Sequence, residues 1–224
     1  MKNILLLFIL FYSGINLANA QENKLEIGGV AGANFSRFYS LKNFNSSITE
    51  KAGLSFAAAF QYNINSIFSA RAEFGLERKG MHSSMSGQVK DENGNPVGMY
   101  RYTLYEHMDY FTFPVLARAS FGEEEKFFVN AGPYFGFLVA KTNKIFASAP
   151  NQFPLKAENN NMDGFKRADF GFSFGAGVSI PANEQLTFTL EIRDNLGLMN
   201  IGKISSARNH SLALLAGFNY SFMD

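Results

Sequence analysis

Six charged residues stand at alternate positions in segments that otherwise alternate between apolar and small polar side chains. Arg71 and Glu73 are two residues apart, and Glu191 and Arg193 repeat this spacing with the charges in reverse order. Residues two apart share one face of an extended strand. If these faces line a lumen, the charges of opposite sign would pair across it, because a buried charge without a partner costs several kcal/mol. Such a face could line a selective passage for ions, or salt bridges could close it. The residues are Arg71, Glu73, Glu77, Arg118, Glu191 and Arg193.

Residues for catalysis or metal binding are sparse. His82, His107 and His210 follow no metal-binding spacing, although Asp109 could serve as a fourth ligand. His107, Asp109 and a loop serine could form a hydrolase triad, but a triad depends on geometry that nothing in the sequence fixes. The chain has no Cys, which excludes disulfides, thiolate metal sites and a Cys nucleophile. We therefore predict no catalytic residue, metal site or cofactor.

The composition excludes several classes of protein. The 224 residues include 25 Phe, and only 17% of them are charged, which is atypical of disordered chains. Lys and Arg total 20 and Asp and Glu total 19, so the chain lacks the basic excess that nucleic-acid binding requires. A domain of this size also has limited core volume for so many Phe side chains.

The first twenty residues have the order of a secretory signal peptide. Lys2 precedes an apolar run over residues 4–12, and Ala18-Asn19-Ala20 forms a cleavage triplet. The run is too short for a membrane-spanning helix. We predict that residues 1–20 are removed and that residues 21–224 form one domain.

Eight segments alternate between apolar and polar side chains with a period of two, which predicts strands with one apolar face. No amphipathic helix of useful length competes with this interpretation. The segments are residues 26–38, 51–64, 67–79, 109–121, 127–142, 169–180, 186–195 and 210–222.

The links between these segments alternate in length. The short links are residues 63–66, 122–126 and 181–185. Outer-membrane barrels have this pattern, with short periplasmic turns and long external loops. The long polar links are residues 39–50, 81–105, 143–168 and 199–209.

The composition of the two faces separates two kinds of barrel. A soluble ligand-carrying barrel would turn its apolar face inward. Here the polar faces mix Gly, Ser, Thr and Asn with a few charges of both signs, which suits a narrow interior better than a water-facing surface. We therefore predict an all-β fold, an eight-stranded antiparallel up-and-down transmembrane β-barrel, in which many Phe side chains face lipid.

The chain has no Trp, so Tyr and Phe must form the aromatic belts at the membrane interfaces. We predict the outer belt from Tyr39, Tyr100, Tyr102, Tyr105 and Tyr110, and the periplasmic belt from Tyr62, Phe68, Phe121, Phe127, Tyr220 and Phe222.

Two strand features stand out. Pro114 and Pro133 fall inside predicted strands, and because proline cannot donate to a strand ladder we expect bulges there. The last strand carries Gly217, Tyr220 and Phe222, which have the pattern of an outer-membrane assembly signal. The pattern departs from the usual form because Met223 and Asp224 follow the final Phe.

These strands resemble the PorT-like outer-membrane β-barrel proteins of Bacteroidetes over nearly all of the mature chain. The resemblance rests on DYFTFPVL at 109–116, AGPYFGFL at 131–138, DFGFSFGAGV at 169–178 and EIRDNLGL at 191–198. That family tends to carry prolines at the places of Pro114 and Pro133. It has no common catalytic residues, and the link of its namesake to type IX secretion is not carried over.

We expect a non-enzymatic protein of the cell outer membrane with a structural or loop-mediated binding role. A narrow solute pore is the alternative, and a lipid-modifying enzyme on the barrel wall is the third hypothesis. An eight-stranded barrel is only just wide enough for its own side chains, which favours a plugged lumen over a pore. The expected partners are outer-membrane lipid, the barrel-assembly machinery, and an extracellular ligand or protein at the long loops.

Overall fold

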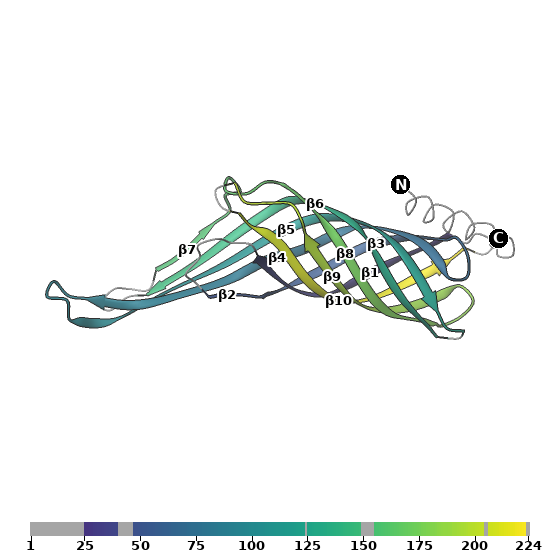
Figure 1. Ribbon diagram of the computed structural model, residues 1–224, viewed down its shortest axis with the longest axis horizontal. Coiled ribbons are helices and arrows are strands. Elements are labelled where there is room, and N and C mark those ends of the chain that lie inside the picture. The colour runs from purple at the N-terminus through teal and green to yellow at the C-terminus, as the bar shows by residue number, and fades with distance from the viewer. Residues whose placement is uncertain (1–24, 40–46, 124, 149–154, 204–205, 223–224) are drawn as a thin grey trace, which may run out of the picture.

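The computed structural model describes residues 25–39, 47–123, 125–148, 155–203 and 206–222, and almost all of them belong to one antiparallel sheet (Figure 1). The strands are β1 (Leu25–Tyr39), β2 (Ser47–Thr49), β3 (Lys51–Asn63), β4 (Phe68–Lys90), β5 (Pro96–Phe121), β6 (Lys126–Ser148), β7 (Leu155–Asn159), β8 (Ala168–Pro181), β9 (Leu186–Gly197) and β10 (Arg208–Ser221).

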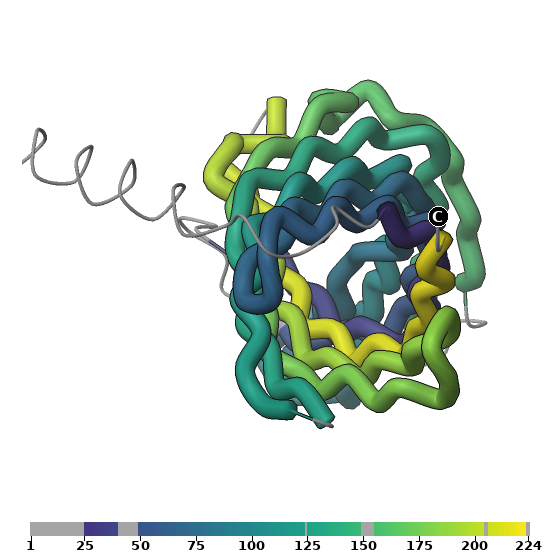
Figure 2. The backbone as a smooth tube through the Cα atoms, turned by 90° about the vertical axis from the view of Figure 1, so that its right-hand side faces the viewer, coloured from purple at the N-terminus to yellow at the C-terminus, as the bar shows by residue number. Residues whose placement is uncertain are grey.

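The eight longer strands close into a barrel. Each is antiparallel to its neighbour along the order β4-β3-β1-β10-β9-β8-β6-β5, and β5 pairs again with β4. Viewed from the end that carries the short turns, the backbone forms a ring (Figure 2). Closure leaves no unpaired strand edge in lipid, where an unsatisfied peptide group costs several kcal/mol. The predicted eight-stranded up-and-down barrel is confirmed; the predicted signal peptide lies outside the described residues.

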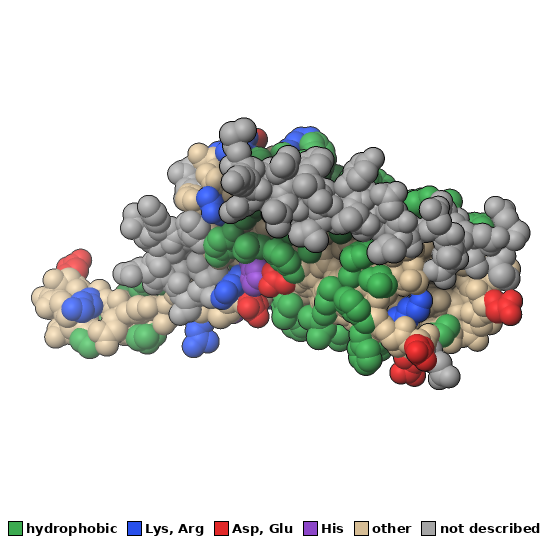
Figure 3. Space-filling model, turned by 45° about the vertical axis from the view of Figure 1, so that its right-hand side comes forward, with side chains coloured by type: hydrophobic (Ala, Val, Ile, Leu, Met, Phe, Trp, Pro, Cys, Tyr) green, Lys and Arg blue, Asp and Glu red, His purple; other side chains and the backbone are tan. Residues whose placement is uncertain are grey.

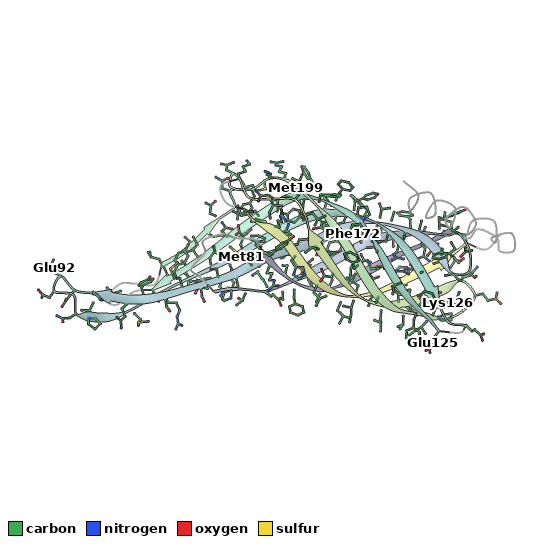
Figure 4. The ribbon with its side chains drawn as sticks, in the orientation of Figure 1. Met81, Glu92, Glu125, Lys126, Phe172 and Met199 are labelled. Carbon is green, nitrogen blue, oxygen red and sulfur yellow. The ribbon has the colours of Figure 1, made fainter. Side chains whose placement is uncertain are left out.

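Three strands run far beyond the others at one end. β4, β5 and β6 have 23, 26 and 23 residues, and β7 pairs with the last part of β6. We call the part of β4–β7 beyond the barrel the projecting sheet; it reaches Glu92 at its tip (Figure 4). At the tip, the N–H groups of Asn95 and Asn93 donate to the Asp91 carboxylate and lower its pKa.

The projecting sheet corrects the prediction of long polar loops over 81–105 and 143–168. Residues 81–90 pair with 96–106, and only the turn between them is a loop. Met81 and Leu104, at the base of this hairpin, pack in a buried apolar cluster. Beyond them most side chains on both faces are partly or fully exposed, so the sequence has no strict alternation of apolar and polar residues. The signal that revealed the other strands was therefore missing.

The outward face of the barrel is apolar. Phe74, Phe113, Leu190 and Leu214 are about half exposed, and their neighbours on the same faces form a band of hydrophobic side chains (Figure 3). The six aromatic residues predicted for the periplasmic belt are all between 38% and 64% exposed. Much of the Phe content thus lies on the surface that meets lipid.

The predicted outer belt is partly wrong. Tyr110 is fully buried inside the barrel, since it alternates with the outward Phe111. Tyr100 and Tyr102 lie in the projecting sheet, on the face opposite to Tyr105. Tyr39 donates a hydrogen bond to the carbonyl of Gly197.

The prolines do not create the predicted bulges. The β5–β6 ladder keeps one register from Pro114–Tyr134 to Ala117–Ala131 and only skips the pairs between them. The register shifts instead beside Asp109, where Val139 is an extra residue on β6. The two neighbouring prolines thus remove ladder hydrogen bonds without adding a residue.

We expect Leu190→Arg, near the middle of the apolar band of β9, to lower the free energy of unfolding by about 2–4 kcal/mol, because Arg is costly at the bilayer midplane. Urea unfolding in lipid vesicles measures this. Glu184→Arg, in an exposed turn, should change the stability by less than about 0.5 kcal/mol. Equal effects of the two variants would contradict the lipid-facing assignment.

Candidate functional site

Five of the six charged residues singled out in the sequence form one cluster inside the barrel. The Glu73 carboxylate accepts hydrogen bonds from Arg71 Nε at 2.7 Å and from Arg193 Nη1 at 2.6 Å. Arg193 Nε also donates to Glu191 at 2.5 Å, and Arg118 lies 3.5 Å from Glu191. We call these residues the lower cluster. All five side chains are at most 5% exposed.

Neighbouring polar and aromatic side chains complete the lower cluster. Arg71 Nη1 donates to Asn219 Oδ1 at 3.0 Å, which links β4 to β10 inside the barrel. The Arg118 guanidinium lies 3.8 Å from the centre of the Phe128 ring. Each strand supplies these groups from its polar face, so alternation alone directs them inward.

The sixth residue, Glu77, belongs to a second group nearer the projecting sheet, which we call the upper cluster. Lys79 Nζ lies 3.5 Å from Glu77 and 3.2 Å from Asp169. Tyr134 donates to Asp169 at 3.2 Å, and Ser211 donates to Glu77 at 2.6 Å. Lys79 and Asp169 were missed in the sequence because each stands at the end of an alternating segment.

A third pair, Glu106 and Lys141, lies 3.1 Å apart beyond the upper cluster. Glu106 fell between the predicted loop at 81–105 and the predicted strand at 109–121. The extra residue Val139 places both Val139 and Ala140 on the outward face, so Lys141 turns inward. A one-residue bulge moves all residues that follow it to the opposite face of the strand. No feature of the sequence indicated the bulge at Val139.

The charges buried inside the described part of the barrel balance. The cations are Arg71, Lys79, Arg118, Lys141 and Arg193, and the acids are Glu73, Glu77, Glu106, Asp169 and Glu191. A buried charge without a partner costs several kcal/mol. Five opposite pairs of charge thus fill the interior without a net charge that would select an ion.

The end of the barrel next to the projecting sheet is closed by apolar side chains. Phe38, Met81 and Met108 are at most 5% exposed. They pack with side chains from two loop segments, among them Phe165 and Ile201. We call this group the apolar cap. Its members are Phe38, Met81, Met108, Tyr110, Leu138, Ile201 and Ala207, with Leu104, Met162 and Phe165 packed against them.

The short-turn end, marked by Lys126 in Figure 4, is open. A polar cavity of about 380 Å³ enters there and has Arg118 and Asn219 among its lining residues. Between the lower and upper clusters lies a small space of about 30 Å³, with Glu73, Glu77 and Arg193 among its lining residues. The lumen of the described structure is therefore blind, closed by two charged clusters and the apolar cap.

The three histidines do not gather. His82 stacks on Tyr105 with ring centres 4.6 Å apart, and His210 Nε2 lies 3.1 Å from Asp194. His107 is two residues from Asp109 on the same face. Over the described ranges, no group of three His, Asp or Glu side chains could hold a metal ion, and no helix is long and apolar enough to cross a membrane.

The residues of the proposed assembly signal lie at the short-turn end of β10. Tyr220 and Phe222 are exposed, and their rings meet edge-on at 5.5 Å. A Cβ at Gly217 would come within 2.8 Å of the Gly29 carbonyl oxygen and of Val30. The close approach of β10 to β1 at this position therefore requires glycine. Their role in assembly stays a prediction.

A family model described as "Outer membrane protein beta-barrel domain" matches residues 19–203. The chain belongs to this family. The predicted location in the outer membrane is confirmed by this membership, and the closed barrel with its apolar band is the structure expected of such a member.

The barrel is similar to several solved structures. Ail of Yersinia pestis is 12% identical, with a TM-score of 0.45 over 90% of this chain and 100% of that chain. Neisserial surface protein A is 14% identical, with a TM-score of 0.46 over 88% and 97%. OprG of Pseudomonas aeruginosa is 10% identical, with a TM-score of 0.46 over 92% and 99%. No curated protein matches the chain in sequence.

We expect Glu73→Ala to destabilise the barrel by about 3–5 kcal/mol, because it leaves Arg71 and Arg193 buried without their shared partner. Unfolding in detergent or vesicles measures the loss. Glu158→Ala is the control: Glu158 is exposed and lies 3.8 Å from Lys144, so its loss should cost less than about 1 kcal/mol. If Glu73→Ala lowered the free energy of unfolding no more than Glu158→Ala does, the ion pairs of the lower cluster would not stabilise the barrel as proposed.

Proposed function

We propose that this outer-membrane barrel binds an extracellular protein or ligand through its projecting sheet and conducts no solute. The observation that carries the proposal is the combination of a blind lumen with a sheet of three long strands that continues beyond the apolar band. By the general pattern of outer-membrane barrels, the short turns face the periplasm. The projecting sheet would then stand outside the cell.

The exposed side chains of the projecting sheet support a binding role. Met85, Val97, Met99 and Leu155 are 44–67% exposed, although they lie beyond the band that contacts lipid. Flexible Met side chains and aromatic residues are common on surfaces that bind partners. β2 pairs with β4 only at residues 82–84. From Met85 to Val89, β4 contains no charged residue and no proline, the features that usually keep an exposed strand edge from pairing with another chain.

The alternatives have less support. A pore would need a path through both charged clusters and the apolar cap. An enzyme on the barrel wall would need a nucleophile, a base and an orienting acid in hydrogen-bond reach. Within the described residues, His82 bonds to Thr49 and His210 contacts Asp194, and neither contact completes such a triad.

We also propose that residues 1–20 act as a cleaved signal peptide, and that Gly217, Tyr220 and Phe222 present the last strand to the barrel-assembly machinery. The strand motifs from 109 to 198 support the proposal that the chain is a PorT-like protein of Bacteroidetes. We propose no role in secretion for it.

In planar bilayers, the purified protein should give no defined single-channel conductance, because the clusters and the cap close the lumen independently. Arg118→Ala should also stay silent, since the upper cluster and the cap remain. A wide porin inserted under the same conditions controls for sensitivity. Reproducible channels from the wild-type protein that change with Arg118→Ala would favour the pore.

Replacing residues 84–103 by Asn-Gly joins Ser83 and Leu104, which face each other in the β4–β5 ladder, through a two-residue hairpin turn. We expect this variant to fold, seen as heat-modifiable gel mobility, and to lose the partners that the wild-type protein co-purifies from native outer membrane. Lys126→Gln, at the opposite end, should retain them. Equal partner sets for all three proteins would contradict the proposal.

A further inference from the structure

A group of basic residues lies just beyond the apolar band on the outward face of β3–β6. Arg78 follows the outward Phe74 and Leu76 on β4, and Lys144 occupies the same face of β6. Lys51, at the start of β3, places its Nζ 5.0 Å from the centre of the Tyr105 ring. His107 stands next to Tyr105 on this face of β5. We call Lys51, Arg78, His107 and Lys144 the basic group.

The acids of the chain only partly neutralise the basic group. Arg78 forms two hydrogen bonds to Asp109, at 2.6 and 2.8 Å, and Lys144 lies 3.8 Å from Glu158. No acidic side chain in the described structure lies within salt-bridge distance of Lys51. One cation in this group thus lacks an acidic partner in the described structure.

The cations of the group act on one another. Burial, Arg78 and Lys144 together lower the pKa of Lys51. Burial, Lys51, Arg78 and Lys144 likewise lower the pKa of His107, against an opposing effect of Asp109. The Nδ1 atom of His107 is buried and has no hydrogen-bond partner. Mutual repulsion of this kind is relieved when an anion binds between the charges.

A hollow of about 410 Å³ adjoins the basic group on the same face of the projecting sheet. Ser84 pairs with Thr103, Ser86 pairs with Arg101, and His82 pairs with Tyr105. Hydroxyl groups both donate and accept hydrogen bonds, and the stacked His82 and Tyr105 rings form one wall. The hollow is thus lined by groups that suit a polyhydroxylated molecule with a negative charge.

We propose that this face binds the phosphorylated sugar headgroup of a membrane lipid. The phosphate would contact the basic group, the sugar would occupy the hollow, and the acyl chains would lie on the apolar band directly below. Basic pockets at the edge of the lipid-contacting surface are suited to anionic headgroups, and Arg and Lys form strong charge-assisted hydrogen bonds to phosphate. The continuity of this face with the apolar band favours a lipid over a free sugar phosphate. The inference goes beyond the proposed partner binding and does not depend on it.

The test is native mass spectrometry of the detergent-purified protein with three probes. They are a disaccharide lipid with two phosphates, the same lipid without phosphates, and soluble glucosamine 1-phosphate. We expect the phosphorylated lipid to bind at least about tenfold more tightly than the other two. The unphosphorylated lipid lacks the charge-assisted hydrogen bonds, and the soluble sugar phosphate lacks the acyl chains that contact the apolar band. Equal binding of the two lipids would overturn the phosphate assignment, and equal binding of the soluble sugar phosphate would overturn the lipid assignment.

Substitutions test whether the basic group contacts the phosphate. The double variant Arg78→Gln/Lys144→Gln should lose most of the preference for the phosphorylated lipid. The control Lys126→Gln/Lys203→Gln removes the same amount of charge elsewhere and should keep the preference for the phosphorylated lipid. An equal loss of this preference in both double variants would show that it depends only on the net charge of the protein. Arg101→Gln, remote from the Arg78–Asp109 pair, should weaken binding without disturbing the barrel, which heat-modifiable mobility checks. Unchanged binding by folded Arg78→Gln/Lys144→Gln and Arg101→Gln proteins would overturn the proposal.

Discussion

Closure of an eight-stranded ring is the constraint on which the rest of the structure depends. It satisfies every strand edge within the membrane, and it also forces alternate residues into a lumen barely wider than their side chains. A charge that enters this space must meet an opposite charge, because water cannot replace the partner. The Glu73 carboxylate shared by Arg71 and Arg193 is the direct result. The apolar outer band and the salt-bridged interior are thus two consequences of the same geometry.

The long strands β4–β6 continue beyond the membrane, and there the two faces of the sheet differ in character. The inward face of β4–β6 meets the apolar cap and the Glu106–Lys141 pair. The outward face continues the surface that contacts lipid, but its side chains change from Phe and Leu to Arg78, Tyr105 and Lys144. Strand continuity therefore places a polar, basic surface in fixed register with the edge of the apolar band. A flexible loop at the same position would fix no such alignment.

Alternation in the sequence predicted the eight barrel strands closely, because lipid on one side and a polar lumen on the other impose opposite requirements on neighbouring residues. It failed for the hairpin beyond Met81, where neither face requires apolar residues. It failed for Lys141, because the extra residue Val139 shifts the alternation and leaves no mark in composition. Tyr110 is a different case. Because it alternates with the outward Phe111, the pattern already placed its side chain inside the barrel, and its assignment to the outer aromatic belt contradicted that pattern.

The distribution of charge argues that the lumen serves stability more than transport. A selective passage works by an imbalance, a ring of one sign that attracts one class of ion. Among the described residues the buried cations and acids are equal in number, and the Glu73 carboxylate already accepts hydrogen bonds from two arginines. An ion that entered would have to break these pairs, and the apolar cap offers it no partner beyond them. The surfaces left for recognition are the projecting sheet and its outward base, where exposed side chains still have unused hydrogen-bonding capacity and charge.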